Sequence, residues 1–434
     1  MDKMADVLGR AGAWCGQNKY LSAIKNAFQN FMPLTIAGAI GVLWCNVLVN
    51  DQTGLGLFFK PIMALDFLNP AFQAVNFCTI SCITVGITLG IAQEIGVWNM
   101  GAERAGYIPG LVGLAAWLSV TNTSHMVDGA KEAFTGVAGN ELGATGLFTG
   151  MIIGVLSVEL FCFFEKQDAL KIKMPEQVPP GVARAFEVLV PATITLIITA
   201  CIGSACYNLT GLYLNDVIKN GIQGPLGAVG ATIPGVMIIY LVIMLFWLVG
   251  IHGNNMLSAV KEALFTPLAL ENVEAFNKGE TPKNIINMYA LQMWGEFGGS
   301  GVTIGLVIAI MIFGKREDNK AIATLSLVPG LFNINETVTF GIPMVLNPIL
   351  GIPFVVAPLI TIIIGYVLTV IGFCPVACLT VPWTTPPLVF GFLATGANIM
   401  GAVTQAILIV VSTVIYTPFL IAYEKYQNKQ AAEA

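Results

Sequence analysis

Charged residues are scarce in this sequence of 434 amino acids. Only 10% of its residues are Asp, Glu, Lys or Arg, whereas 56% are hydrophobic. A chain of this length could form two soluble domains, but soluble domains carry roughly 25% charged residues, so the composition excludes that class. The fold class predicted instead is an all-α polytopic membrane protein. The thinly spread net charge of −5 gives no indication of a nucleic acid partner.

Long apolar runs recur along the chain, and many of them approach the roughly 20 residues that a helix needs to cross a bilayer. They lie near residues 33–49, 71–93, 107–120, 145–164, 187–210, 231–251, 297–314, 345–373 and 399–423. Residues 321–350 and 374–398 could each hold a further partial span. We therefore predict about ten transmembrane helices.

Cationic residues gather in four regions, which are residues 1–28, 166–184, 315–320 and 425–429. Loops that stay in the cytoplasm are rich in Lys and Arg, so we predict that all four regions, and with them both termini, face the cytoplasm. Residues 1–28 lack the features of a secretory signal and instead predict an amphipathic helix on the membrane surface. If the predicted spans simply alternated in direction across the membrane, these four regions would not all face the cytoplasm. Residues 253–300 therefore include either a re-entrant hairpin or a crossing that hydropathy misplaces.

Patterns for metal, nucleotide or nucleophilic chemistry are missing. The nine cysteines lie almost wholly in apolar runs, and neither Cys78 with Cys82 nor Cys374 with Cys378 has a His or Asp nearby to complete a metal site. Buried free cysteine behaves as a small hydrophobe, so we expect these residues at helix contacts and predict no metal and no cofactor. An intramembrane hydrolase would need a nucleophile beside a base or a metal cluster, and the sequence offers neither.

Two ionisable side chains lie where the apolar pattern is broken. Glu336 stands among amides and helix breakers in residues 331–348, and His252, one of only two histidines, ends a long apolar run and precedes Gly and two Asn. An ionisable group at membrane depth costs roughly 2.5 kcal/mol or more, so by default it marks a ligand site or a proton path. We predict that both side chains belong to one buried polar site for a hydroxyl-rich ligand.

Further polar and aromatic residues near these breaks are candidates for substrate binding. Non-helical backbone at membrane depth is tolerated only inside protein or along a watery cavity, so residues 321–347 predict one re-entrant hairpin and residues 252–255 open a second. The substrate-binding candidates in these broken stretches are Asn254, Asn255, Ser300, Asn333, Asn335, Trp383 and Trp247. Taken alone, the glycine-rich turn around Ser300 could equally serve helix packing, and the two tryptophans could equally be interfacial anchors.

Cations are missing from the stretches that would build this site. No Lys or Arg occurs between Lys320 and Lys425, and only Lys219 occurs between Arg184 and Lys261. A carboxylate or phosphate would have no fixed cation to pair with, so a neutral substrate fits. Amide, imidazole and carboxylate groups offer donors and acceptors to sugar hydroxyls, and an indole face covers the apolar side of a pyranose.

The two halves of the chain differ in their spans. Up to about residue 220 the spans are regular and rich in Gly and Ala, which allows close helix packing. Beyond residue 231, glycines, prolines and amides interrupt the apolar runs, and transporters often bind substrate between such broken segments. We predict a scaffold domain at residues 1–220 and a substrate-binding domain at residues 221–434.

Four motifs in one order resemble a known family. They are Met32-Pro-Leu-Thr-Ile-Ala-Gly38, Ile251-His-Gly253, Phe297-Gly-Gly-Ser-Gly301 and Asn333-Ile-Asn-Glu336, the last followed by a Phe-Gly-Ile-Pro-Met-Val-Leu-Asn-Pro run. Together they resemble the lactose/cellobiose (diacetylchitobiose) family of phosphotransferase-system sugar permeases, the membrane IIC component. The resemblance covers essentially the whole chain.

The resemblance implies the IIC fold, with about ten transmembrane helices and two re-entrant hairpins, in a homodimer held together by residues 1–220 in the bacterial cytoplasmic membrane. It also implies that a β-linked disaccharide of the diacetylchitobiose, cellobiose or lactose class moves inward by an elevator-like motion. The sugar would be phosphorylated from a phosphocysteine on a separate IIB protein. An enzymatic step would therefore occur only together with IIB, and this chain needs no nucleotide site.

The resemblance also assigns roles to the two central side chains. Glu336 would accept or orient the proton of the attacking sugar hydroxyl, and His252 would hydrogen-bond the same hydroxyl. The family usually has Pro directly after this Glu, whereas Thr337 follows it here, which leaves the backbone less constrained. Trp247 and Trp383 become sugar contacts under this interpretation.

Two alternatives stay open at this level. A proton-coupled secondary sugar transporter would use Glu336 and His252 as a proton relay and leave its substrate unmodified. Lys315, Arg316 and Lys320 are predicted to help dock the IIB protein, since clustered charge steers protein partners, but an anchor of membrane topology explains the same cluster.

Overall fold

The computed structural model describes residues 10, 13–14, 17–51, 55–125, 133–175, 177–342 and 344–433. The surface helix predicted over residues 1–28 falls mostly outside these ranges, and the first described helix, α2, begins at Lys19. Contacts divide the chain into two compact units. We call Gln17–Gly38 with Val75–Gly227 the N-terminal unit, and Ala39–Ala74 with Ala228–Ala434 the C-terminal unit. The predicted domains instead divide the chain once, near residue 220.

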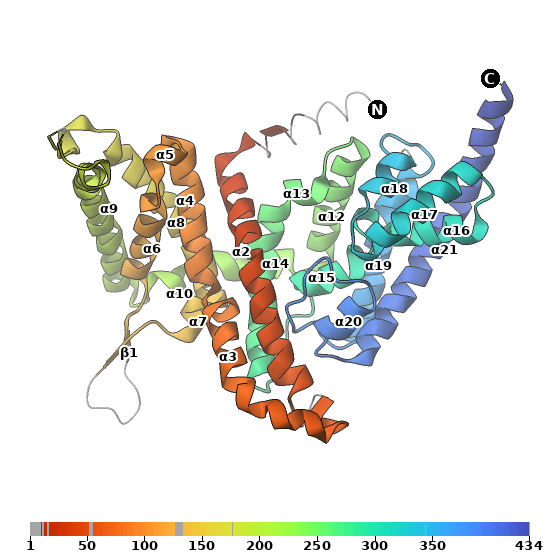
Figure 1. Ribbon diagram of the computed structural model, residues 1–434, viewed down its shortest axis with the longest axis horizontal. Coiled ribbons are helices and arrows are strands. Elements are labelled where there is room, and N and C mark those ends of the chain that lie inside the picture. Colours follow the sequence, from red (N-terminus) through yellow and green to blue (C-terminus); the bar gives the residue numbers. More distant parts are fainter. Residues whose placement is uncertain are drawn as a thin grey trace. The chain divides into compact units, whose positions relative to one another are not determined.

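The N-terminal unit is a bundle in which α4, α6, α8 and α9 pack against one another (Figure 1). A two-residue antiparallel ladder joins strands β1 (Ser124–His125) and β2 (Phe134–Thr135). The helices of this unit are α2 (Lys19–Leu43, whose end belongs to the other unit), η4 (Ile80–Cys82), α4 (Ile83–Met100), α5 (Ala102–Ala105), α6 (Ile108–Val120), α7 (Gly139–Leu142), α8 (Ala144–Glu165), η5 (Asp168–Leu170), α9 (Pro180–Thr210), α10 (Leu214–Ile218), η6 (Lys219–Gln223) and the start of α11 (Gly224–Gly230).

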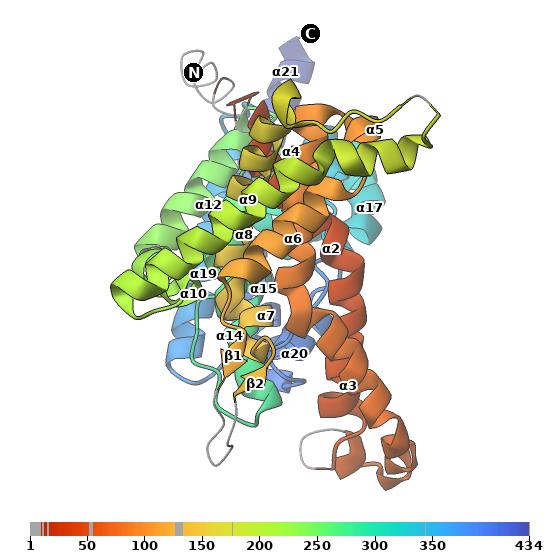
Figure 2. The same cartoon turned by 90° about the vertical axis from the view of Figure 1, so that its left-hand side faces the viewer.

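Small residues allow the close approach of these helices. A Cβ atom added at Gly113 of α6 would lie 2.3 Å from the Cβ of Ala92 on α4, and one at Gly150 of α8 would lie 2.2 Å from the hydroxyl of Thr88. Contacts this short are not tolerated, so glycine at these positions sets the helix spacing. Figure 2 shows α9 running alongside α6 and α8.

The C-terminal unit contains many short helices, as the interrupted apolar pattern predicts. Its elements are η1 (Trp44–Leu48), η2 (Leu55–Leu57), η3 (Lys60–Leu68), most of α3 (Asn69–Cys78), α12 (Ile233–Leu248), α13 (Gly253–Met256), α14 (Ser258–Asn277), α15 (Met288–Gly295), η7 (Ser300–Val302), α16 (Ile304–Phe313), α17 (Glu317–Leu331), α18 (Glu336–Gly341), α19 (Gly351–Val370), α20 (Val389–Ala394) and α21 (Ile399–Glu433). Its core is built on large buried side chains that include Tyr240, Trp247, Trp294, Phe297 and Phe354.

Six helical stretches in the described ranges are long and apolar enough to cross a membrane. They are Lys19–Leu48, Lys60–Met100, Ala144–Glu165, Pro180–Thr210, Gly351–Val370 and Ile399–Gln430. The pair Met288–Val302 and Ile304–Phe313, bent by 60°, adds a seventh if it is one span, and α6 and α12 are apolar but shorter. The predicted number of about ten spans is larger than this number and stays a prediction. Residues 374–398, where the sequence predicts a partial span, form turns and one short helix.

Glycine and asparagine make the breaks that interrupt the C-terminal unit. Gly298, Gly299 and Gly301 have φ angles of 70°, 88° and 78°, which let the chain turn sharply between α15 and α16. Asn333 has a φ of 62° at the tip between α17 and α18, and these two helices pack against each other. Asparagine is one of the few residues that adopts this conformation readily. α17, this tip and α18 thus form a helical hairpin over most of residues 321–347, and its re-entry into the membrane stays a prediction.

A buried carboxylate fixes the turn between α16 and α17. Glu424 of α21 is only 5% exposed and accepts hydrogen bonds from the backbone N–H groups of Lys315 (2.8 Å) and Arg316 (3.3 Å) and from the Asn319 amide (3.1 Å). A carboxylate at the start of a helix also interacts favourably with the helix dipole. The cationic segment 315–320 is therefore held against α21.

Replacing Glu424 by alanine is expected to destabilise the protein. The substitution removes the acceptor of two backbone N–H groups and one of the two acceptors of the Asn319 amide. An unsatisfied buried group costs about 1–3 kcal/mol, so the thermal midpoint in detergent should fall. Glu317→Ala is the matched control, since Glu317 pairs with Lys320 at 3.1 Å but its side chain is 86% exposed. Such exposed pairs contribute at most about 1 kcal/mol. Equal shifts for the two variants would contradict the anchoring role of Glu424.

Candidate functional site

The structure brings His252 and Glu336 together although they are far apart in the sequence. His252 lies between α12 and α13, and Glu336 is the first residue of α18 (Figure 1). The His252 Nε2 atom lies 3.8 Å from Glu336 Oε1, and the two side chains are 37% and 47% exposed. This distance exceeds a hydrogen bond, so the pair leaves a position from which a ligand hydroxyl can reach both groups.

The local backbone determines which nitrogen of His252 faces Glu336. The imidazole caps α13, and its Nδ1 accepts a hydrogen bond from the backbone N–H of Asn255 at 3.3 Å. In the neutral ring the proton must then be on Nε2, the nitrogen that faces Glu336. Gly253 is required at the next position, because a Cβ atom there would lie 2.0 Å from the carbonyl oxygen of Ile243.

Trp247 supports the imidazole from the core. Its ring centroid lies 4.4 Å from that of His252, and Phe340 and Phe354 pack around it. Trp247 is only 1% exposed, which leaves no ring face for a sugar. The sequence interpretation of Trp247 as a sugar contact or an interfacial anchor is therefore corrected, because the end of α12 turns this side chain into the core.

Trp383, in contrast, is 44% exposed and presents its indole at the surface of the C-terminal unit. Its backbone carbonyl accepts a hydrogen bond of 2.5 Å from the Asn333 amide. Trp383 thus lies in a loop that is attached to the tip preceding Glu336. The exposed indole on this loop is a candidate platform for the C–H face of a sugar.

Asn333 is used by the protein itself. Its Oδ1 atom accepts the backbone N–H of Gly298 at 2.6 Å, and its Nδ2 atom donates to the carbonyls of Trp383 (2.5 Å) and Thr385 (3.1 Å). One side chain therefore joins three irregular segments, namely residues 297–301, 331–335 and 381–387. The sequence predicts this amide as a ligand donor, whereas the structure commits it to the backbone.

Asn335 makes a second connection of the same kind. Its amide donates to the Ser300 carbonyl at 2.8 Å and to the Thr339 hydroxyl at 3.2 Å, and the residue is 4% exposed. Both asparagines position the backbone around Glu336. Sugar contact by either side chain stays a prediction.

Asn254 and Ser300 are brought together by a hydrogen bond of 3.0 Å from the Asn254 amide to the Ser300 hydroxyl. Ser300 is buried, and the Asn254 Oδ1 atom is buried without a hydrogen-bond partner among the described residues. An unpaired buried acceptor is costly, so this oxygen is a candidate acceptor for a ligand. Asn255 is exposed, and its backbone groups are used by His252 and Ser258.

Sequence reasoning missed a buried ion pair in the same unit. Lys261 of α14 pairs with Glu296 at the end of α15, and the Tyr240 hydroxyl donates to the same Glu296 oxygen at 2.7 Å. The Lys261 and Glu296 side chains are 7% and 16% exposed, and both act electrostatically on His252. The expectation of no fixed cation is therefore corrected, although Glu296 compensates the charge of Lys261. The sequence signal that could have predicted this ion pair is the presence of Lys261 among the apolar residues of α14.

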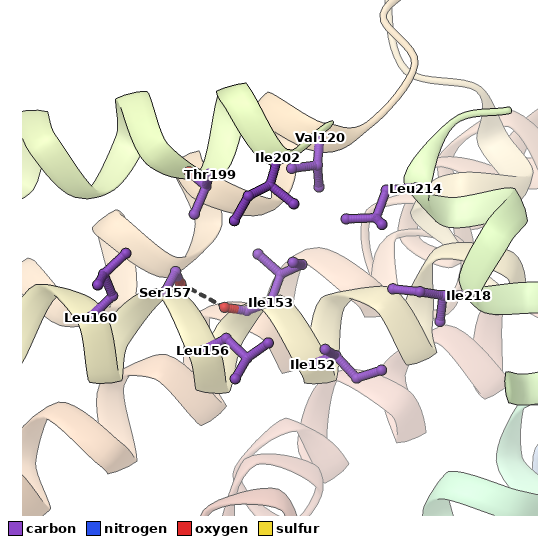
Figure 3. A pocket seen from close by; sticks show the side chains of 10 residues that line it. All are labelled: Val120, Ile152, Ile153, Leu156, Ser157, Leu160, Thr199, Ile202, Leu214 and Ile218. Atoms are coloured by element: carbon purple, nitrogen blue, oxygen red, sulfur yellow. Dashed lines mark hydrogen bonds between the residues drawn. The ribbon is translucent and has the colours of Figure 1, made fainter. Parts of the chain in front are cut away.

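Two other kinds of site, a metal site and an apolar pocket, do not suit a sugar within the described ranges. No group of three or more His, Cys, Asp or Glu side chains there is arranged to hold a metal ion. A pocket of about 190 Å³ between α6, α8, α9 and α10 is lined mainly by Ile, Leu and Val side chains (Figure 3). The Ser157 hydroxyl in its lining donates a hydrogen bond of 2.6 Å to the Ile153 carbonyl. The pocket therefore lacks free polar groups for a sugar.

Comparison with known proteins shows the family to which this chain belongs. Residues 25–358 match the family described as "Phosphotransferase system, EIIC". The oligo-beta-mannoside-specific EIIC component of Bacillus subtilis is 33% identical over 98% of this chain and 94% of its own length. The cellobiose-specific EIIC component of Lactococcus lactis is 30% identical over 98% of both chains. The lactose-specific EIICB component of Streptococcus mutans is 31% identical over 96% of this chain and 71% of its own length.

A solved structure shows the same fold. The transporter ChbC, the IIC component of the N,N'-diacetylchitobiose-specific phosphotransferase system, superposes with a TM-score of 0.88. It is 30% identical and covers 97% of both chains. The predicted resemblance is thus confirmed, and the helical fold is that of a IIC component. This chain belongs to the EIIC family of the phosphotransferase system and is a membrane permease for sugars.

Proposed function

We propose that this permease binds a neutral β-linked disaccharide, moves it inward and presents it for phosphorylation by a IIB protein. The names of its relatives support the substrate class, since they specify oligo-beta-mannoside, cellobiose and N,N'-diacetylchitobiose. A relative named EIICB supports a B component as the partner. The observation that carries the proposal is the approach of His252 Nε2 to Glu336 Oε1 at 3.8 Å.

Charge compensation favours a neutral ligand at this site. The buried cation, Lys261, is already paired with Glu296, so an anionic substrate would find no uncompensated positive charge there. The available groups are the Asn254 carbonyl oxygen, the imidazole N–H and the exposed Trp383 indole. Hydrogen-bonding groups together with one aromatic face suit the hydroxyl edge and the C–H face of a pyranose.

His252 and Glu336 act on one sugar hydroxyl. The hydroxyl donates its proton towards the Glu336 carboxylate while its oxygen accepts a hydrogen bond from His252 Nε2–H. As the oxygen attacks phosphorus, the new O–P bond forms and the S–P bond of the phosphocysteine on IIB breaks. The proton passes to Glu336, and the thiolate leaves with IIB. The contribution of this chain is positioning and base assistance.

The two units have different tasks in this proposal. The N-terminal unit supplies the homodimer contact and stays fixed in the cytoplasmic membrane. Both termini of the chain face the cytoplasm. The C-terminal unit carries the sugar and moves relative to the fixed unit in an elevator-like manner. Support comes from the regular, closely packed helices of the first unit and from the location of the whole candidate site in the second.

Substitution of Glu336 and His252 is expected to separate binding from transfer. Glu336→Gln should keep most sugar binding but lower IIB-dependent phosphorylation about a hundred- to ten-thousand-fold, because only the carboxylate can accept the proton. His252→Ala should weaken binding and transfer together, because the imidazole contact precedes the chemistry. Equilibrium sugar binding and phosphorylation rates measure the two effects.

Glu280→Gln serves as the control for these variants, since this carboxylate is exposed and lies outside both the candidate site and the cationic segment 315–320. A Glu336→Gln protein that phosphorylates sugar within tenfold of the parent would exclude the proposed base role. Sugar uptake into vesicles under a proton gradient without IIB would instead favour a secondary transporter.

Asn333→Asp is expected to weaken sugar binding about tenfold while changing the rate at saturating sugar much less. Aspartate keeps the acceptor for Gly298 and tolerates the positive φ, but it removes the two donors that hold the carbonyls of Trp383 and Thr385. KM for sugar and kcat measure the two parts. Asn398→Asp is the control, since Asn398 acts as an acceptor for the N–H of Met400. An unchanged KM would contradict the connecting role of Asn333.

The cationic segment between α16 and α17 yields a test of IIB docking. Arg316 is bonded to Asp318 at 2.7 Å and Lys320 to Glu317 at 3.1 Å, whereas the Lys315 side chain is exposed. Replacing Lys315, Arg316 and Lys320 by Gln should raise KM for IIB several-fold at low salt and leave sugar binding intact. A KM for IIB that stays unchanged at every ionic strength would leave the cluster as a topology anchor.

A further inference from the structure

The N-terminal unit contains a second cavity, separate from the sugar site, that is lined mainly by charged side chains. Its volume is about 680 Å³, and it lies where α5, the end of α8, η5 and the start of α9 meet. These elements lie at one end of the unit (Figures 1 and 2). The cations that line it are Arg104, Lys171, Lys173 and Arg184. None of them has a task in the sugar chemistry.

Two arginines form the rigid wall of this cavity. Arg104 and Arg184 both bind the buried carboxylate of Glu165, at 2.7 and 3.0 Å. The same two guanidinium groups bind Glu187, each at 2.9 Å. Four charged groups therefore form a closed network that joins α5, α8 and α9. This network fixes the geometry of the wall before any ligand arrives.

The lysines supply the less committed positive charge. Lys171 lies 3.2 Å from Asp168 and 3.9 Å from Glu187. Lys173 also lines the cavity but has no ion pair within 4.0 Å in the part of the chain that the structure describes. Among the described residues, four cations face three carboxylates, those of Glu165, Glu187 and Asp168, so these side chains carry one excess positive charge.

An apolar stripe on α9 runs next to the cavity. Pro180, Arg184 and Glu187 line the cavity, at the spacing of one helix face. The neighbouring face presents Val182, Phe186 and Leu189, which are 46%, 38% and 49% exposed. Since α9 is one of the helices long and apolar enough to cross a membrane, this exposed stripe is suited to contact acyl chains.

We propose that this cavity binds the headgroup of an anionic glycerophospholipid. One phosphodiester carries the single negative charge that balances the excess positive charge, and basic pockets between membrane helices are known to accept such headgroups. The volume is sufficient for a glycerol phosphate, and the stripe on α9 receives the acyl chains. Binding would connect α5, α8 and α9 of the N-terminal unit to the surrounding membrane.

Native mass spectrometry of the full protein, with lipids added in detergent, tests this site. The parent protein should retain phosphatidylglycerol at least tenfold more than zwitterionic phosphatidylcholine, since each cation at a membrane surface adds several-fold to the binding of an anionic lipid. The double variant Lys171→Gln, Lys173→Gln should retain about tenfold less phosphatidylglycerol than the parent protein. Lys166→Gln with Lys425→Gln is the matched control, because both lysines are exposed, lie outside the cavity lining and should leave retention unchanged.

Four results would overturn the proposal. Equal retention of the two lipids by the parent protein would do so even if the double variant failed to fold. Unchanged phosphatidylglycerol retention in a double variant that still binds sugar would exclude these lysines. Displacement of the lipid by millimolar inorganic phosphate would indicate a site for a free anion, and displacement by unphosphorylated IIB would indicate a protein interface instead.

Discussion

Every polar backbone group that a helix break exposes inside an apolar protein must find a partner, and this requirement shapes the C-terminal unit. Side-chain amides meet it. Asn333 pairs with the N–H of Gly298 and with the carbonyls of Trp383 and Thr385, and Asn335 pairs with the Ser300 carbonyl. The same bonds fix the backbone on both sides of Glu336. The groups that make the breaks possible therefore also position the carboxylate.

The buried charges of the C-terminal unit are paired for the same reason, since each buried charge also needs a partner. Lys261 is buried but compensated by Glu296, which also accepts the Tyr240 hydroxyl. A removed partner would leave an uncompensated buried charge, so such pairs are kept together. The positive charge of Lys261 is therefore compensated within the protein. This compensation is in keeping with the neutral substrate proposed above.

The sequence predicted His252 and Glu336 as a candidate pair because ionisable residues at membrane depth are rare. The structure places the two side chains 3.8 Å apart. The sequence also predicted helix breaks, since Gly and Asn have local conformational signatures. The sequence could not predict contacts between residues that are far apart along the chain. Nothing local shows that Asn333 binds the loop of Trp383, that Trp247 turns into the core, or that Lys261 meets Glu296. The grouping of Ala39–Ala74 with the C-terminal unit is also a long-range property.

In the proposed mechanism, one sugar hydroxyl lies between His252 and Glu336. A cryo-EM structure of the protein with a bound disaccharide, such as cellobiose or diacetylchitobiose, tests it most directly. The account predicts one hydroxyl oxygen within about 3 Å of both His252 Nε2 and a Glu336 carboxylate oxygen, with a pyranose ring over Trp383. A bound sugar whose hydroxyl oxygens all lie beyond hydrogen-bonding distance of Glu336 would contradict it.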